Sequence, residues 1–143
     1  MTNTRYKHPD TELEQVNNHL RTQKKAAQKI GVVFMGKQAP GGNNVVDGLL
    51  RYQAQRSDVE LVGFMNGVTG LLNSDYEVMT RETFKNFVNL GGYDYIGRGP
   101  DELRTEQAKA KTMEAANLLK LTGLVFVGAT NAMTDALYLA EYF

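Results

Sequence analysis

The chain has 143 residues, of which 42% are hydrophobic, and its 16 Lys and Arg residues balance its 16 Asp and Glu residues. This size and composition fit one globular domain with a packed core. A net charge of zero, with no basic stripe, argues against nucleic-acid binding. No apolar run approaches the roughly 20 residues that cross a bilayer, so no membrane role is expected. The absence of cysteine excludes disulfides and fits the cytoplasmic location that we expect.

Residues 1–29 predict a helical lead-in to this domain. Thr11 and Glu14 have the spacing of a capping box, and apolar residues follow at helical spacing: Leu13, Val16 and Leu20. The apolar stripe is thin, so the surface against which this helix packs stays open. The two histidines, His8 and His19, form no cluster of metal ligands.

A predicted strand and a predicted helix follow, at 30–35 and 42–55. The first run is β-branched and aromatic, as expected for a strand that is buried on both faces of a parallel sheet. The second has apolar residues at helical spacing, and we expect Asn43 or Asn44 to cap its first turn.

The loop between them has the composition of an anion site. Gly36 allows a sharp turn, and Gly41 removes side-chain bulk just before the helix. The free backbone N–H groups at a helix N-terminus attract anions. The loop matches neither the Walker motif nor G-x-G-x-x-G. Phosphate binding and a tight structural turn are therefore equal alternatives on local geometry alone.

The rest of the chain alternates predicted strands and helices. Strands are predicted at three apolar runs: Val59 to Met65, Tyr93 to Ile96 and Leu124 to Val127. Glycine-containing loops follow these runs, at Gly67 and Gly70, at Gly97 and Gly99, and at Gly128. Helices are predicted from Thr80 to Asn89, from Asp101 or Thr105 onward, and from Met133 to Phe143.

This order of elements predicts an α/β fold with three layers, a mostly parallel sheet and Rossmann-like crossovers. Loops at the carboxyl ends of parallel strands lie at one edge of the sheet, where ligands bind in open α/β folds. We therefore expect the glycine loops to meet there and to form a shared anion site. The last helix is expected to pack on the sheet through Leu137, Tyr138 and Ala140.

Five separated motifs resemble the N-terminal part of pyrophosphate-dependent phosphofructokinases. They are GVVFMGKQAPGGNNVVDGLL (31–50), FMNGVTGLL (64–72), NLGGYDYIGRG (89–99), LRTEQ (103–107) and NLLKLTGLVFVGATNAMTDALYLAEYF (117–143). The resemblance implies that residues 30–143 form the N-terminal, incomplete portion of a phosphofructokinase-like α/β domain. It also implies phosphoryl transfer from pyrophosphate to fructose 6-phosphate with Mg²⁺, in a homo- or hetero-oligomer of phosphofructokinase subunits.

The chain departs from the family pattern at two loops. Lys37 replaces the second glycine after the first strand, and the run from Gly128 to Ala132 replaces Gly-Gly-Asp-Asp-Ser. Because the carboxylates are missing, this chain is not expected to bind Mg²⁺. Asp135 is interpreted as an early-helix acid rather than a replacement ligand. The pattern is similar to the non-catalytic α-type subunit, and the family's catalytic-base motif belongs downstream of Phe143.

We expect no catalytic and no metal-binding residue in this chain. The resemblance and the glycine loops together point to eight candidates for phosphate binding: Gly36, Lys37, Gly41, Arg98, Arg104, Gly128, Thr130 and Asn131. The expected ligand is pyrophosphate or a phosphorylated sugar.

Three functions stay open at this point. The favoured one is a regulatory or degenerate segment of a pyrophosphate-dependent phosphofructokinase. The second is part of an active phosphotransferase that downstream residues complete. The third is a non-enzymatic phosphate-binding or structural α/β module, since a fold does not fix a function.

Overall fold

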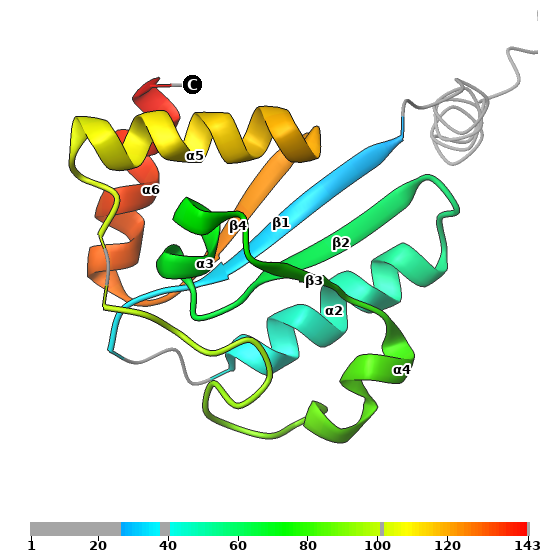
Figure 1. Cartoon of the computed structure of the whole chain (residues 1–143). Helices are drawn as coiled ribbons and strands as arrows, with labels where there is room; N and C mark the ends of the chain where they lie inside the picture. The colour runs from blue at the N-terminus through cyan, green and yellow to red at the C-terminus, as the bar shows by residue number, and fades with distance from the viewer. Residues whose placement is uncertain (1–26, 38–40, 101, 143) are drawn as a thin grey trace, which may run out of the picture.

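The computed structural model describes residues 27–37, 41–100 and 102–142 (Figure 1). Its strands are β1 (Gln28–Phe34), β2 (Val59–Phe64), β3 (Tyr76–Val78) and β4 (Gly123–Val127). Its helices are α2 (Gly42–Ala54), α3 (Val68–Asn73), α4 (Arg81–Phe84), α5 (Glu106–Leu119) and α6 (Thr130–Tyr142), with a 3₁₀ turn at Lys85–Phe87. The predicted helical lead-in lies outside the described residues, except that its last residues belong to β1.

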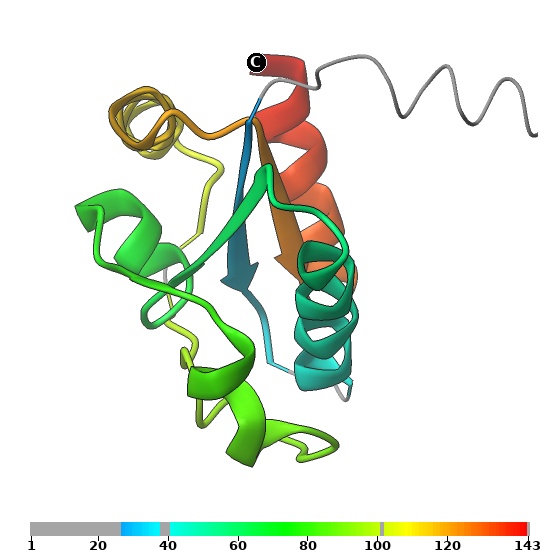
Figure 2. The ribbon, with the colours of Figure 1, turned by 90° about the vertical axis from the view of Figure 1, so that its right-hand side faces the viewer.

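The strands form one sheet in the order β3-β2-β1-β4. β1 runs parallel to both β2 and β4, and Ile30 is level with Leu61 on one side and Gly123 on the other. β3 is antiparallel and closes one edge. The predicted α/β fold with a mostly parallel sheet is confirmed. Figure 2 shows the sheet nearly edge-on, with helices on both of its faces, so the fold has three layers.

Consecutive residues of β1 fill two separate cores, as the alternation of a strand requires. Val32 and Phe34 pack with Val46 and Leu50 of α2 on one face of the sheet. On the other face Val33 packs with apolar residues of α3 and α5. Val32, Phe34, Val46 and Leu50 are each at most 1% exposed. The expectation of a strand buried on both faces is confirmed.

The predicted strand at 93–96 is wrong, because this segment forms turns above the sheet. Gly92 and Gly97 both have left-handed φ angles, and Gly97 N donates to Tyr93 O (2.8 Å) to close a turn. Ile96 is fully buried and lies over Gly63 of β2, where a Cβ would approach it within 2.8 Å. An apolar segment that packs over a sheet has the same composition as a strand within the sheet. The sequence therefore did not distinguish the two for residues 93–96.

The helices differ from prediction at their ends and, in one case, in their inward face. Thr80 caps α4 with a capping box as expected, but α4 is short and ends in the 3₁₀ turn. Thr105 caps α5, whereas the alternative start at Asp101 lies outside the described residues. α6 begins three residues earlier than predicted, at Thr130.

The expected inward face of α6 is wrong. Leu137 and Tyr138 are 61% and 47% exposed, and Ala140 is exposed as well. The buried face instead carries Ala132, Asp135 and Leu139. The sequence did not predict this face as the buried one, because it includes the carboxylate of Asp135.

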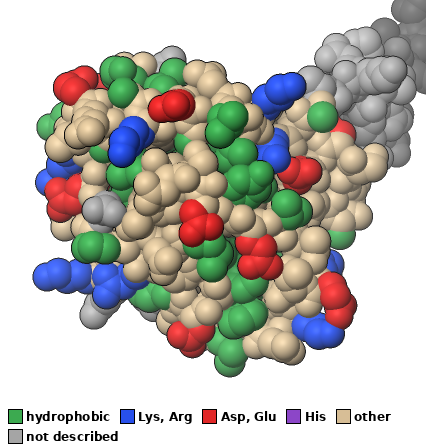
Figure 3. Space-filling model, viewed as in Figure 1, with side chains coloured by type: hydrophobic (Ala, Val, Ile, Leu, Met, Phe, Trp, Pro, Cys, Tyr) green, Lys and Arg blue, Asp and Glu red, His purple; other side chains and the backbone are tan. Residues whose placement is uncertain are grey.

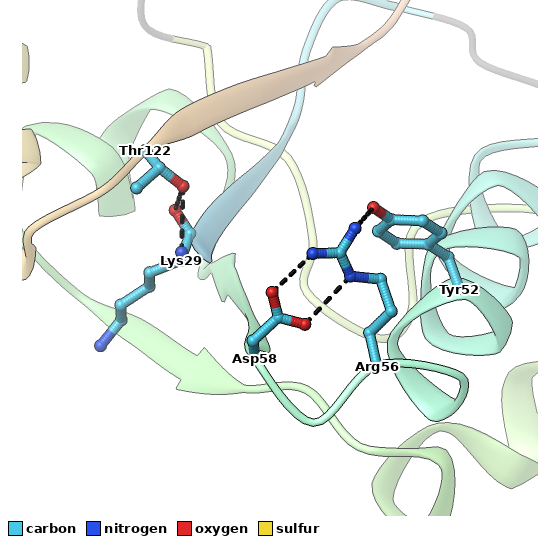
Figure 4. Close-up of polar contacts among 5 residues, drawn as sticks. All are labelled: Lys29, Tyr52, Arg56, Asp58 and Thr122. Atoms are coloured by element: carbon cyan, nitrogen blue, oxygen red, sulfur yellow. Dashed lines mark hydrogen bonds and ion pairs between the residues drawn. The ribbon is translucent and has the colours of Figure 1, made fainter. Parts of the chain in front are cut away.

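Polar contacts secure the edge of the sheet where the parallel strands begin (Figure 4). Thr122 joins β4 to β1 by accepting from Lys29 N (3.0 Å) and donating to Lys29 O (3.1 Å). Arg56 binds both carboxylate oxygens of Asp58 and donates to Tyr52 Oη (2.7 Å). The hydrogen bond to Asp58 raises the pKa of Arg56 above its ordinary value. These contacts lie at the end of the strands opposite the glycine loops.

Acidic and basic side chains are interspersed on the face of the molecule that Figure 3 shows. Among the described residues, no helix combines the length and apolarity required to span a bilayer.

Candidate functional site

The loops that follow β1 and β4 lie against each other. Met35 N donates to Val127 O (2.9 Å), which aligns the two carboxyl ends. A Cβ built on Gly36 would lie 3.9 Å from Ala129 N, and one built on Gly128 would lie 2.6 Å from Met35 O. The Gly36 and Gly128 loops therefore lie side by side, as predicted. They are close enough for one phosphate group to contact both.

The N-terminus of α2 opens at this edge without a side-chain cap. Its N-cap is Gly41, which has a left-handed φ of 119°, and the first turn contains no acidic residue. The expected capping by Asn43 or Asn44 is wrong, because Gly41 takes this position and Asn43 is buried. Uncapped first-turn N–H groups carry partial positive charge and attract anions.

α6 brings a second helix N-terminus to the same edge. It starts immediately after Gly128 and Ala129, and Met133 N donates to Ala129 O (3.2 Å). Thr130 and Asn131 are exposed in its first turn, which contains no acidic residue. Thr130 and Asn131 thus place neutral side chains where the resemblance implies two carboxylates.

The loops that follow β2 and the segment 97–99 interlock beside this edge. A Cβ on Gly67, which has a φ of +66°, would lie 2.2 Å from Phe34 O and 3.2 Å from Gly99 N. A Cβ on Gly99 would lie 2.5 Å from Asn66 O. The loop with Gly97 and Gly99 therefore reaches the expected edge by packing on the turn after β2, although no strand precedes it.

The cationic candidates have different surroundings. Arg98 is exposed, its Nη1 donates to Gly36 O (2.9 Å), and its guanidinium carbon lies 5.2 Å from the centre of the Tyr93 ring. Lys37 is exposed, and within the described part of the chain it has neither a hydrogen bond nor an ion pair. Lys37 thus offers a positive charge at this edge that no described residue neutralises.

Arg104 is bound to Asp135 of α6 rather than left free for a ligand. Arg104 Nε lies 2.5 Å from Asp135 Oδ1, and Leu103 N donates to Asp135 Oδ2 (3.5 Å). The Asp135 side chain is 3% exposed and that of Arg104 is 40% exposed. The hydrogen bond to Asp135 raises the pKa of Arg104. Asp135 therefore anchors the segment before α5 to α6, a role that neither sequence interpretation included.

The residues at this edge do not fit Mg²⁺. The run from Gly128 to Asn131 carries no carboxylate, and the buried Asp135 is already paired with Arg104. Within residues 27–37, 41–100 and 102–142, no three His, Cys, Asp or Glu side chains are grouped as metal ligands. A hard cation prefers several charged oxygen ligands, and the described residues of the Gly36 and Gly128 loops carry none.

Asn43 is a residue at this site that the sequence did not reveal. It is 1% exposed, and its Nδ2 donates to Leu90 O (3.0 Å). Asn43 Oδ1 and Tyr93 Oη are buried, and neither has a hydrogen-bond partner among the described residues. An Asn in the first turn of a predicted helix is read as a surface cap, so no local signal indicated a buried contact across 47 positions.

An apolar cavity of about 450 Å³ lies away from this edge, between α5, the start of β4 and α6. Its lining includes Ala116, Leu121, Leu124 and Ala136. It contains none of the candidate phosphate-binding residues.

Comparison with known proteins identifies the family. The phosphofructokinase family model matches residues 29–143. The pyrophosphate–fructose 6-phosphate 1-phosphotransferase subunit alpha 2 of Arabidopsis thaliana is 39% identical over 117 residues, which are 81% of this chain and 19% of that protein. The subunit beta of Solanum tuberosum is 40% identical over 116 residues, 80% of this chain and 20% of its own length. The enzyme of Porphyromonas gingivalis is 36% identical over 115 residues, 80% of this chain and 21% of its own length.

Solved structures agree on the fold. Phosphofructokinase of Pichia pastoris in the T-state superimposes with a TM-score of 0.72 at 18% identity, over 82% of this chain and 13% of that one. Phosphofructokinase of Saccharomyces cerevisiae gives 0.70 at 22% identity, over 80% and 16%. The chain spans about a fifth of the length of its curated relatives, and alpha and beta subunits resemble it equally. The strand order, the glycine loops and these matches together show that the chain belongs to the phosphofructokinase family.

Proposed function

We propose that this chain is a segment of a pyrophosphate-dependent phosphofructokinase subunit that binds a phosphate-bearing ligand but does not transfer the phosphoryl group itself. The observation that carries the proposal is the contact between the Gly36 and Gly128 loops at a carboxylate-free edge. Two helix N-termini open there without acidic residues in their first turns. Such an edge attracts anions and offers a metal nothing to hold it.

In this proposal the glycine loops and the first turns supply the ligand contacts. Gly36, Gly41 and Gly128 allow the backbone to approach a phosphate closely, and Thr130 and Asn131 offer neutral hydrogen bonds. Lys37 supplies the free positive charge that takes the place of the metal. Arg98 and Arg104 are less available, because each already binds a group of the protein.

The ligand class follows from the family. The relatives are named as pyrophosphate–fructose 6-phosphate 1-phosphotransferase subunits. We therefore propose pyrophosphate or a phosphorylated sugar as the ligand, in a cytoplasmic homo- or hetero-oligomer of phosphofructokinase subunits. The regulatory or degenerate role is supported by the loss of both loop carboxylates, since a phosphoryl group in transfer needs a strong positive counter-charge.

A second candidate function is an active phosphotransferase, in which residues outside this chain supply the base and Lys37 replaces the metal. The free charge of Lys37 beside the Gly128 loop favours it. The third candidate is a structural module without a ligand. It does not explain why the N–H groups at the α2 N-terminus have no side-chain cap.

Turnover separates these candidates. The purified protein is assayed for fructose 1,6-bisphosphate formed from pyrophosphate and fructose 6-phosphate, alone and with a phosphofructokinase subunit that retains Gly-Gly-Asp-Asp-Ser. The proposal expects no product from the protein alone and a changed rate when the other subunit is present. Product formed by the protein alone would establish the active phosphotransferase instead.

A further inference from the structure

We infer that Asn43 and Arg98 are positioning residues that fix the two ends of the anion loop to one segment, Leu90–Arg98. This inference rests on the proposed function, because it assigns a mechanism to the same site. One end of the loop is Gly36, just after β1. The other is the first turn of α2, which contains Asn43.

The α2 end is held by a buried amide. Asn43 Nδ2 donates to Leu90 O (3.0 Å), and the Asn43 side chain is shielded from water, with 1% of the residue exposed. A buried amide that loses its acceptor is costly, so this bond fixes the position of Leu90 relative to α2. The neighbouring Asn44 is exposed and makes no comparable contact with another described residue.

The β1 end is held by the guanidinium of Arg98. Its Nη1 donates to Gly36 O (2.9 Å) while its flat face lies over the Tyr93 ring, 5.2 Å from the ring centre. Tyr93 in turn packs edge-on against Phe34, the last residue of β1, with ring centres 5.8 Å apart. Stacking and hydrogen bonding together restrict the guanidinium more than either contact alone.

The two anchor points belong to one stretch of chain, and its second half is fastened by hydrogen bonds. Gly97 N donates to Tyr93 O (2.8 Å), and Asn66 N donates to Ile96 O (2.6 Å), which fastens the stretch to the loop after β2. Ile96 is fully buried over the sheet. We expect a displacement of Leu90 to reach Arg98 along the chain, and Gly36 through Arg98.

The consequence is a clamp made of Asn43, Leu90, Tyr93, Arg98 and Gly36. An anion site made of backbone N–H groups depends on their direction within fractions of an ångström. The clamp sets this direction at both ends of the loop. The Asn43 side chain, whose amide faces Leu90, acts on the ligand through the backbone and not by contact.

The test compares Asn43→Leu with the matched control Asn44→Leu, one position further along the same helix turn. Without ligand, amide signals of Gly36 and Lys37 in NMR spectra are expected to move in Asn43→Leu and to stay in place in Asn44→Leu. With pyrophosphate added, Asn43→Leu is expected to bind about fivefold more weakly than wild type, the factor of one net hydrogen bond. The control is expected to bind as wild type does.

Arg98→Lys is the second variant, since its exposed site tolerates the change if Asn43→Leu fails to fold. Lys keeps the charge but loses the flat stacking surface, so amide signals of Leu90 and Tyr93 are expected to move. The combined variant is expected to weaken binding by less than the product of the single effects. Unmoved Gly36 and Lys37 signals in Asn43→Leu, or independent effects in the combined variant, would overturn the clamp. Absence of pyrophosphate binding by the wild type would overturn the proposed function. The amide signals of Gly36 and Lys37 without ligand would still show whether Asn43 and Arg98 form the clamp.

Discussion

Substitution of Gly67 by alanine tests the interlock of the glycine loops, because two separate costs add at this position. A φ of +66° is unfavourable for any residue with a Cβ, by about 1–2 kcal/mol. The added Cβ would also lie 2.2 Å from Phe34 O, a backbone atom that cannot move aside cheaply. Overpacking of this kind costs about 1–3 kcal/mol. Gly67→Ala is therefore expected to lower the free energy of unfolding by about 2–5 kcal/mol.

Two control glycines separate the costs. Gly41 has a φ of +119° but nothing within 4 Å of a Cβ, so Gly41→Ala carries only the conformational cost of about 1–2 kcal/mol. Gly91 has neither feature, and Gly91→Ala is expected to change stability by no more than about 0.5 kcal/mol. Urea unfolding followed by circular dichroism measures all three variants. If Gly67→Ala is no less stable than Gly41→Ala, the close approach of the two loops is refuted.

Three further predictions concern the ion pair, the aromatic cluster and the free cation. Asp135→Ala removes the buried partner of Arg104 and is expected to lower the unfolding free energy by about 1–3 kcal/mol in urea, and a loss below about 0.5 kcal/mol would contradict the anchoring role. Burial raises the pKa of Tyr95, so the stability it contributes is present below its unfolded pKa of about 10 and is lost as the pH rises through the folded pKa. The stability difference between wild type and Tyr95→Phe should therefore shrink as the pH rises above about 10, and a constant difference would refute this assignment. Lys37→Gly is expected to weaken pyrophosphate binding about fivefold in a calorimetric titration, whereas Lys120→Gly, the same substitution near the start of β4, should leave it unchanged. Equal affinities for these two variants would mean that the loop is scaffold.

The sequence predicted the three parallel strands and the meeting of their loops because strong local patterns encode them. The β-branched run before Gly36 could only be a buried strand, and its glycines marked the turn. Thr80 was recognised as a helix start, and Thr105 as one of two alternative starts, because capping signals are local. The order of these elements then placed the loops at one edge through the handedness of crossovers.

Long-range pairing could not be read from the sequence. Asp135 on the inner face of α6 is tolerated because Arg104, 31 positions away, binds it. Asn43 is buried because Leu90, 47 positions away, supplies an acceptor for its amide. Each of these residues looks like a surface group until its partner is in place, and local periodicity contains no information about the partner.

Titration with pyrophosphate, followed by amide NMR signals in the absence and presence of Mg²⁺, tests the central claim most directly. The claim is that the Gly36 and Gly128 loops form one anion site in which no metal takes part. Amide signals of both loops are expected to move together, at the same pyrophosphate concentration, whether or not Mg²⁺ is present. Signals that stay in place, that move in one loop only or that move only with Mg²⁺ would contradict the account.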